Sequence, residues 1–159
     1  MGTEELLAVF RTTPTPALLL MARSREYRVF EVNEAFLRHS FRQRDQILGA
    51  SLQDVLLPAD GEWDAGELLQ SLERVRKEKA EHRMRAARYQ VPRRERPGFS
   101  VCYFAPRNIP VLNGDGEVAF ILHILEPATL RDKEAHALGF SEAQLEVLNY
   151  RSLFDQNPD

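Results

Sequence analysis

Two side chains, His123 and Cys102, have the chemistry to bind a ligand or to react. A neutral imidazole can exchange hydrogen bonds with a ligand or bind haem iron, whereas a thiol becomes a redox sensor only when it is exposed and its pKa is lowered. Both residues also have a structural interpretation, because a core histidine is commonly satisfied by a neighbour and a buried strand cysteine is inert. As Cys102 is the only cysteine, an intramolecular disulfide and a cysteine-rich zinc site are excluded.

The chain lacks the residue patterns that mark common catalytic sites. It contains no nucleotide-binding glycine loop, no His-x-x-x-His pair and no Gly-x-Ser-x-Gly nucleophile turn. We therefore expect no catalytic residues and no metal site, and we keep a small enzyme with a pocket of its own only as an alternative.

Both side chains belong to a predicted β-hairpin from Phe99 to Thr129 that turns at Asn113–Gly116. Gly114 and Gly116 can adopt the positive φ that tight hairpin turns require. Because side chains alternate along a strand, the second strand has two faces. One face carries Ala119, Ile121, His123 and Leu125, and the other carries Val118, Phe120, Leu122 and Ile124.

The elements before the hairpin predict an α+β fold with an antiparallel sheet. A short helix over residues 3–10 precedes strands at 17–22 and 27–32, and Asn33 is expected to cap the next helix. Short helical turns are expected at 44–48 and 51–56, and Asp64 and Glu67 have the spacing of a capping box before a longer helix. That helix has an apolar stripe at Leu68, Leu69, Leu72 and Val75, and a third strand follows at 82–91.

The charge of the chain is unevenly distributed although its net value is only −3. Residues 53–73 contain six acidic residues and no Lys or Arg, whereas residues 74–96 contain ten basic residues and three acidic ones. Tyr89 is the only aromatic residue among the basic ones, so they lack the repeated aromatic residues that binding of single-stranded nucleic acid requires, and the neighbouring acidic segment can neutralise them. We therefore expect no nucleic-acid partner. No signal sequence or membrane-length apolar run is present, which favours a cytoplasmic setting without membrane contact.

The order of elements and three sequence motifs resemble the PAS domain over residues 6–129. The motifs are Phe10 with Pro14 and Pro16, the run Val32–Phe36, and the hairpin. The hairpin is similar to the PAS subset that reads YWSPxNxPVLDxDGxVxxIIHRVEDVT. The matching residues are Tyr103, Pro106, Asn108, Pro110, Val111, Leu112, Gly116, Val118, Ile121, His123, Glu126 and Thr129. Pro127, Cys102 and Phe104 stand where that subset has Asp, Arg and Trp.

The resemblance implies a five-stranded antiparallel sheet with helices on one face, flanking helices at both ends, and a pocket between the sheet and the longer helix. The expected pocket residues are Phe36, Leu72, Cys102, Phe104, Ile121 and His123. A flavin of the light-oxygen-voltage (LOV) type is not expected because Cys102 lies in a strand rather than in the helical region. Haem is not expected either, because the long helix, which more often supplies its histidine, offers only His82 at its end. The cofactor, if any, stays undetermined.

The resemblance also implies a sensory module of a receptor, most typically a two-component histidine kinase. Leu6, Leu7 and Phe10 are the expected homodimer surface, and Glu126, Pro127 and Thr129 the expected signal exit. In many PAS sensors an Asp at the position of Pro127 is thought to link the last strand to the output helix. Since Pro127 has no carboxylate, we do not expect it to form this link. We expect a domain at residues 1–129, an exit helix at 130–152 and, because Phe154–Pro158 repeats the pattern of Phe10–Pro14, the start of a second PAS domain at 153–159. A ligand-free scaffold that serves only for dimerisation and spacing is the main alternative. Other expected partners are later PAS or kinase domains of the same chain and an unknown small molecule.

Overall fold

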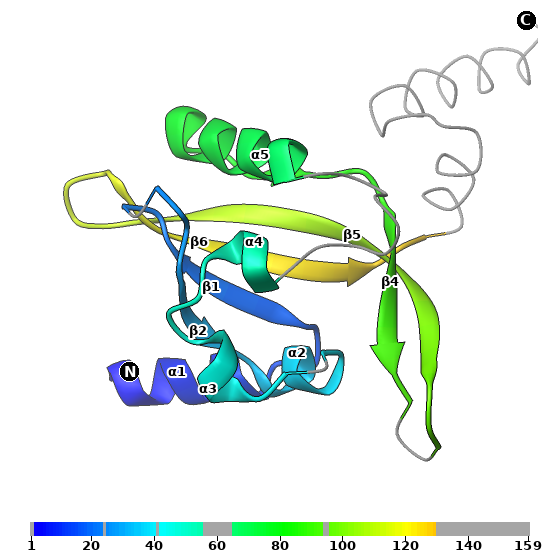
Figure 1. Cartoon of the computed structure of the whole chain (residues 1–159). Coiled ribbons are helices and arrows are strands. Elements are labelled where there is room, and N and C mark those ends of the chain that lie inside the picture. The colour runs from blue at the N-terminus through cyan, green and yellow to red at the C-terminus, as the bar shows by residue number, and fades with distance from the viewer. Residues whose placement is uncertain (1, 24, 41, 56–64, 94–95, 130–159) are drawn as a thin grey trace, which may run out of the picture.

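The computed structural model describes residues 2–129 except 24, 41, 56–64 and 94–95. In this part of the chain an antiparallel sheet has the strand order β2-β1-β6-β5-β3, and β4 also pairs with β5 (Figure 1). The α+β prediction with an antiparallel sheet is confirmed. The expected exit helix at 130–152 and the expected second domain at 153–159 lie outside the described residues.

The predicted hairpin is present and lies in the centre of the sheet. Strand β5 (Phe99–Leu112) pairs with β6 (Val118–Pro127) over most of its length. At the turn, Gly116 has a φ of +78°, while Gly114 does not adopt positive φ, so only one of the two glycines is needed for the turn. A bulge near the turn pairs Leu112 with Val118 but Val111 with Phe120. Val118 is therefore buried with the core, although simple alternation places it on the face opposite to Ile121 and His123.

The expected strand at 82–91 is divided into β3 (His82–Arg83) and β4 (Ala87–Pro92), which makes six strands rather than five. Arg83 pairs with Arg107 and Ala87 pairs with Phe104, so three residues on this side oppose only two on β5. The extra residue makes a bulge, and beside it the successive residues Ala86 and Ala87 are both buried, which regular alternation along one strand does not explain.

The first elements are held together by one buried asparagine. Helix α1 (Thr3–Thr12) leads to β1 (Ala17–Met21) and β2 (Val29–Val32), and Asn33 then caps α2 (Glu34–Arg38). Oδ1 of Asn33 accepts hydrogen bonds from the backbone N–H of Phe36 at 2.9 Å and of Ala17 at 3.0 Å. Its Nδ2 donates to the carbonyls of Thr13 and Thr15. The predicted cap is confirmed, and it also fixes the segment between α1 and β1.

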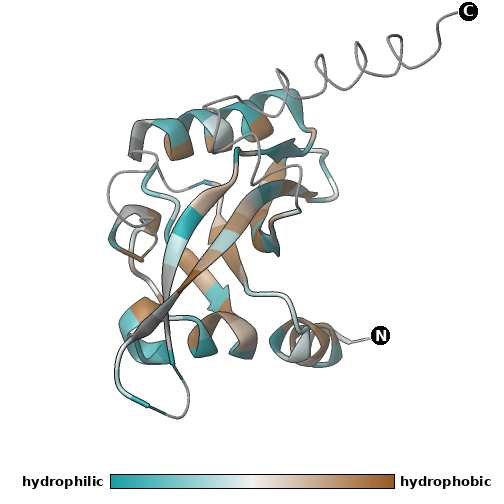
Figure 2. Cartoon of the chain, turned by 90° about the vertical axis from the view of Figure 1, so that its right-hand side faces the viewer, coloured by the Kyte–Doolittle hydropathy of each residue, from teal (hydrophilic) through white to brown (hydrophobic). Residues whose placement is uncertain are grey.

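The remaining helices cover the face of the sheet that carries Ile121 and Leu125. They are α3 (Arg44–Ile47), α4 (Leu52–Val55) and α5 (Ala65–Glu78). Leu68, Leu72 and Val75 of α5 are buried in the same apolar cluster as Ile121 and Leu125. In Figure 2 the apolar positions of α5 lie on the side turned toward the strands. The predicted apolar stripe of this helix is therefore the one that forms the core.

Candidate functional site

His123 lies on β6 in the middle of the sheet, and its side chain has no exposed surface. It is paired across the sheet with Asn108 of β5 and with Leu18 of β1. Nδ1 of His123 lies 2.6 Å from Oδ1 of Asn108. Residues directly opposite in an antiparallel sheet share a face, so both polar side chains enter the core together.

The His123–Asn108 pair continues into a series of polar side chains that we call the core polar chain: His123, Asn108 and Ser71, which are buried, and His82, which is half-buried. Nδ2 of Asn108 donates to Oγ of Ser71 at 2.8 Å, and this Oγ lies 2.7 Å from Nδ1 of His82. The core polar chain therefore links β6, β5, α5 and β3. Sequence reasoning selected His123 but missed the other three members as its partners. The available signal was an asparagine in mid-strand, where this residue type is disfavoured.

The core polar chain determines which nitrogen of His123 carries hydrogen. Because Asn108 directs its amide nitrogen to Ser71, its oxygen faces Nδ1 of His123, and Nδ1 must therefore be the donor. Burial lowers the pKa of His123 to about 4, so the ring is neutral at pH 7. Nε2 is then a bare acceptor, and it has no hydrogen-bond partner among the described residues.

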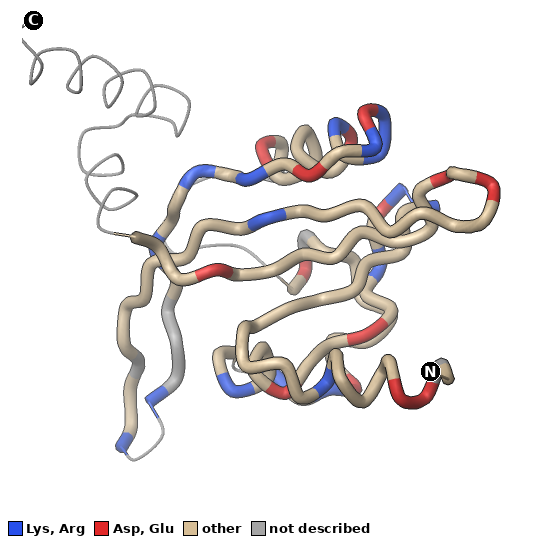
Figure 3. The backbone as a smooth tube through the Cα atoms, turned by 180° about the vertical axis from the view of Figure 1, so that it is seen from behind, with Lys and Arg blue, Asp and Glu red and all other residues tan. Residues whose placement is uncertain are grey.

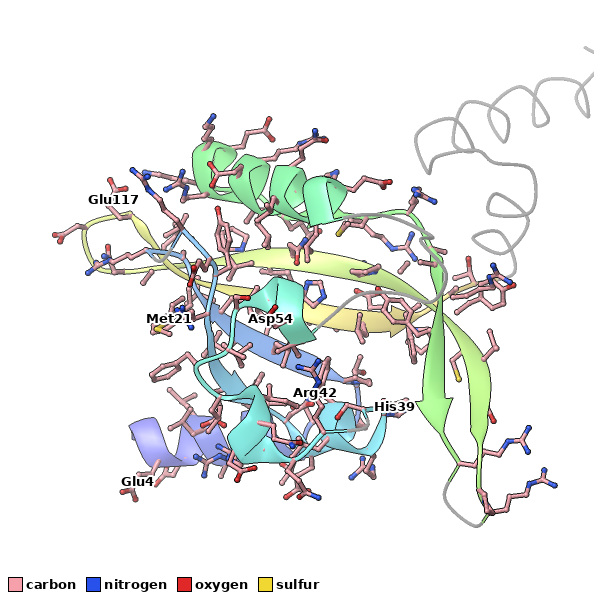
Figure 4. All side chains as sticks on the ribbon, viewed as in Figure 1. Glu4, Met21, His39, Arg42, Asp54 and Glu117 are labelled. Carbon is pink, nitrogen blue, oxygen red and sulfur yellow. The ribbon has the colours of Figure 1, made fainter. Side chains whose placement is uncertain are left out.

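The expected apolar pocket residues come together in the structure. Phe36, Leu72, Phe104 and Ile121 are buried in one cluster, and Cys102 is half-buried and packs against it. The ring of Phe104 contacts the rings of Tyr89 and His39 edge-on, with centroids 5.6 and 5.8 Å away. Figure 4 labels His39 at the end of α2, beside the strands. Proximity is thus established, whereas a ligand-binding role for these residues stays a prediction.

A groove of about 390 Å³ lies on the opposite face of the sheet, between the end of α1 and the end of β6. The residues that line it are Phe10, Thr13, Thr15, Ala17, Leu122, Ile124, Glu126 and Pro127. It therefore brings one expected dimer residue, Phe10, next to two expected signal-exit residues, Glu126 and Pro127.

A family model described as the PAS fold matches residues 12–133, which is most of the chain. The chain belongs to the PAS family. No curated protein matches it significantly.

Solved structures agree with this assignment at the level of the fold. The PAS domain of the fruit-fly ELK potassium channel is 15% identical with a TM-score of 0.55, and the match covers 81% of this chain and 98% of that one. For the PAS domain of an HTR-like protein from Haloarcula marismortui, the identity is 21%, the TM-score 0.53 and the coverage 79% and 91%. An RNA-binding light-oxygen-voltage receptor is 13% identical with a TM-score of 0.59; the match covers 97% of this chain but spans only 38% of that receptor.

The exit residues of the PAS domain differ in their contacts. Pro127 is the last residue of β6 and is exposed. As a proline it has no carboxylate to contribute. The neighbouring Glu126 instead forms an ion pair with Arg107 of β5 at 2.7 Å. Thr129 is exposed at the end of the described chain. A carboxylate contact is therefore present at this end of the sheet, one residue before the expected position.

The expected dimer residues on α1 are not equally accessible. Leu6 is 56% exposed, whereas Leu7 and Phe10 are half-buried. The helix also exposes Val9, at 59%, which sequence analysis did not select. The accessible apolar surface of α1 is therefore formed by Leu6 and Val9, one helical turn apart.

Charged residues of the acidic and basic segments do pair with each other. Glu67 forms an ion pair with Arg85, and Glu73 pairs with Arg76. In Figure 3 basic residues also mark the tip of the ribbon formed by β4 and the start of β5. Within the described ranges no three His, Cys, Asp or Glu side chains gather as metal ligands, and no helix is long and apolar enough to cross a membrane.

Proposed function

We propose that this PAS domain is a cytoplasmic sensory and dimerisation module of a signal-transduction receptor, of the two-component histidine kinase type. The observation that carries the proposal is the groove in which Phe10, from the end of α1, meets Glu126 and Pro127, from the end of β6. A displacement of either segment changes the surface that the other contacts. The groove is thus suited to couple a dimer contact to the exit of the domain.

In this proposal the domain works by a population shift. A molecule in the core stabilises one arrangement of the sheet and its flanking helix over another, by as much as its affinities for the two arrangements differ. His123 and Glu126 lie on opposite faces of the same strand, so a change in the core reaches the groove through β6. Glu126 and its partner Arg107 are the contact through which the change would leave the domain.

A ligand-free scaffold is the second candidate, and one observation favours it. Phe36, Leu72, Phe104 and Ile121 are packed in a single cluster. In a scaffold this packing would be the final state of the core. Native mass spectrometry separates the two candidates, because a sensor purified with its ligand has a mass above that of the denatured chain.

The dimer is tested by sedimentation equilibrium on the 159-residue chain. We expect a dimer that dissociates in the Leu6→Glu and Val9→Glu variants, because each places a charge in an apolar contact. Val101→Glu is the matched control, since Val101 is 53% exposed but lies on the β4–β5 ribbon away from α1. A monomeric parent chain, or dissociation in all three variants alike, would contradict the proposed interface. The coding sequence beyond Asp159 tests the receptor context, where we expect kinase domains.

A further inference from the structure

We propose that Nε2 of His123 is the hydrogen-bond acceptor of a core ligand site for a small, neutral, mainly apolar molecule that carries one O–H or N–H donor. The inference rests on the proposed sensory function and specifies the chemical class of the molecule sensed. It starts from one atom, because Nε2 is a buried polar atom with no partner in the described part of the chain.

The polar partners of His123 make Nε2 an acceptor rather than a donor. Ser71 accepts from Nδ2 of Asn108, so Asn108 presents its oxygen to Nδ1 of His123. The ring has one hydrogen when neutral, and this hydrogen is used at Nδ1. Asn108 and Ser71 are therefore positioning residues: they act on the ligand only by fixing the tautomer of His123.

The neighbours of His123 on the inner face exclude a charged ligand. Ile121 and Leu125 flank it along β6, and Leu18 lies opposite on β1. All three are buried and apolar, so an ion placed here would lose its hydration without gaining a counter-charge. A neutral donor loses far less hydration free energy than an ion, and it bonds to the lone pair of Nε2, which is otherwise unpaired.

The site therefore suits an alcohol, a phenol or a heterocycle with an N–H group, each of which would bind through its single polar group. Its selectivity comes from that one bond, because the apolar walls cannot distinguish two molecules of the same shape. A site that offers an unpaired acceptor discriminates against an analogue that lacks the donor.

The experiment uses the 159-residue chain with ¹⁵N-labelled histidine and two probes of similar shape, indole and indene. Indole has an N–H donor and indene has none. In the free protein we expect long-range ¹H–¹⁵N spectra to show hydrogen on Nδ1 of His123 and none on Nε2. Indole should shift the Nε2 resonance to saturation and bind about tenfold more tightly than indene, as one net hydrogen bond allows.

Two variants assign the effect to His123. His123→Phe should abolish the preference for indole, whereas His39→Phe should keep it, because Nδ1 of His39 bonds only to the carbonyl of Ala35. In Ser71→Ala the amide of Asn108 is free to turn, so we expect both tautomers of His123 to appear. If His123→Phe does not fold, the comparison of indole with indene in the parent chain still decides.

The inference is overturned by hydrogen on Nε2 in the free protein, by equal affinity for the two probes, or by failure of both to bind. A haem absorption band that His123→Phe removes would also overturn it, since iron would then occupy the lone pair. These outcomes are separate from the dimer test. A dimer without indole selectivity removes only this inference, whereas indole selectivity in a monomer removes the proposed dimeric function.

Discussion

Nδ1 of His123 lies 2.6 Å from Oδ1 of Asn108, and neither side chain is exposed to solvent. The pair lies at one position of the β5–β6 ladder, so its geometry is set by the register of the hairpin. Because the other nitrogen of the ring is unpaired, protonation of His123 would place a charge in the core without compensation.

The first prediction is a loss of stability in mild acid. The pKa of His123 is lowered to about 4 by burial, below its value in the unfolded chain. The unfolded state therefore binds this proton first, and the contribution is complete above the unfolded pKa and lost as the pH falls toward 4. From pH 7 to pH 5 we expect the free energy of unfolding to fall by about 2 kcal/mol through this group, measured by urea denaturation at each pH.

His123→Leu is the control for this pH dependence. The variant has no titrating group at this position, so its unfolding free energy should be nearly constant over the same interval. The pKa values of Glu31 and Glu73 are lowered from the ordinary 4.5, so the contributions of these groups are lost mainly as the pH falls through and below 4.5, outside the interval from pH 7 to pH 5. Equal slopes in parent and variant would show that His123 is not the group responsible.

The second prediction concerns Asn33 and Asn113, two asparagines that each accept two backbone hydrogen bonds. Oδ1 of Asn33 does so in the core, whereas Oδ1 of Asn113 accepts from Asp115 and Glu117 in the exposed hairpin turn. Asn33→Ala should lower the unfolding free energy by about 2–3 kcal/mol, because the N–H of Ala17 is left buried without a partner. Asn113→Ala should cost about 1 kcal/mol or less, since water can replace the amide. Similar losses in the two variants would refute the argument from burial.

The third prediction compares two glutamates in ion pairs. Glu31 is buried and accepts from Arg11 and Arg44, whereas Glu26 pairs with Arg28 at the surface. Burial alone would raise the pKa of Glu31, but the N–H of Val32 and the two guanidinium groups outweigh it and hold the pKa below its usual value. Glu31→Gln should cost about 1–3 kcal/mol in unfolding free energy, and Glu26→Gln less than about 0.5 kcal/mol.

Because Arg11 is on α1, Glu31→Gln should also release that helix. Amide hydrogen exchange in α1 should be faster than in the parent chain, while exchange in β5 and β6 stays unchanged. Unchanged exchange in α1 would mean that Glu31 contributes to the stability of the sheet but does not hold the helix.

The fourth prediction uses the two glycines of the hairpin turn. Gly116 has a φ of +78° and Gly114 does not adopt positive φ, and a Cβ at either position would meet no atom within 4 Å. Gly116→Ala should therefore cost about 1 kcal/mol from backbone strain alone. Gly114→Ala should stay within about 0.5 kcal/mol of the parent chain. Thermal unfolding of the two variants is sufficient for this comparison, and equal melting temperatures would contradict it.

Local patterns in the sequence predicted much of the fold. Alternation along β6 correctly placed Ile121, His123 and Leu125 on one face, which the resemblance to the PAS domain implied to be the inner one, and an asparagine before a helical run predicted the cap at Asn33. The bulge near the hairpin turn and the bulge between β3 and β4 were missed because a bulge inserts a residue without a distinctive residue type. The bulge near the hairpin turn accompanies the burial of Val118, and the bulge between β3 and β4 divides the expected third strand.

The candidate site was predictable only in part. His123 stood out as a polar residue on an apolar face, and the hairpin register places Asn108 opposite it. Ser71 and His82 join the core polar chain only because α5 crosses the sheet at this point, and local periodicity contains no information about that crossing. The groove was missed for the same reason, since its two sides come from opposite ends of the domain.

The ribbon of β4 and early β5 has a consequence for self-association. Among the described strands, residues Phe99 to Cys102 pair only with β4, so this ribbon leaves backbone groups available for another strand on either side. Such edges invite intermolecular sheet formation, and Val101 adds an exposed apolar side chain. Arg93 and Arg96 are exposed at its tip, beside Pro97, and charge and proline are the features that keep sheet edges from aggregating. We therefore expect the basic tip to oppose association of the protein with itself in concentrated solution.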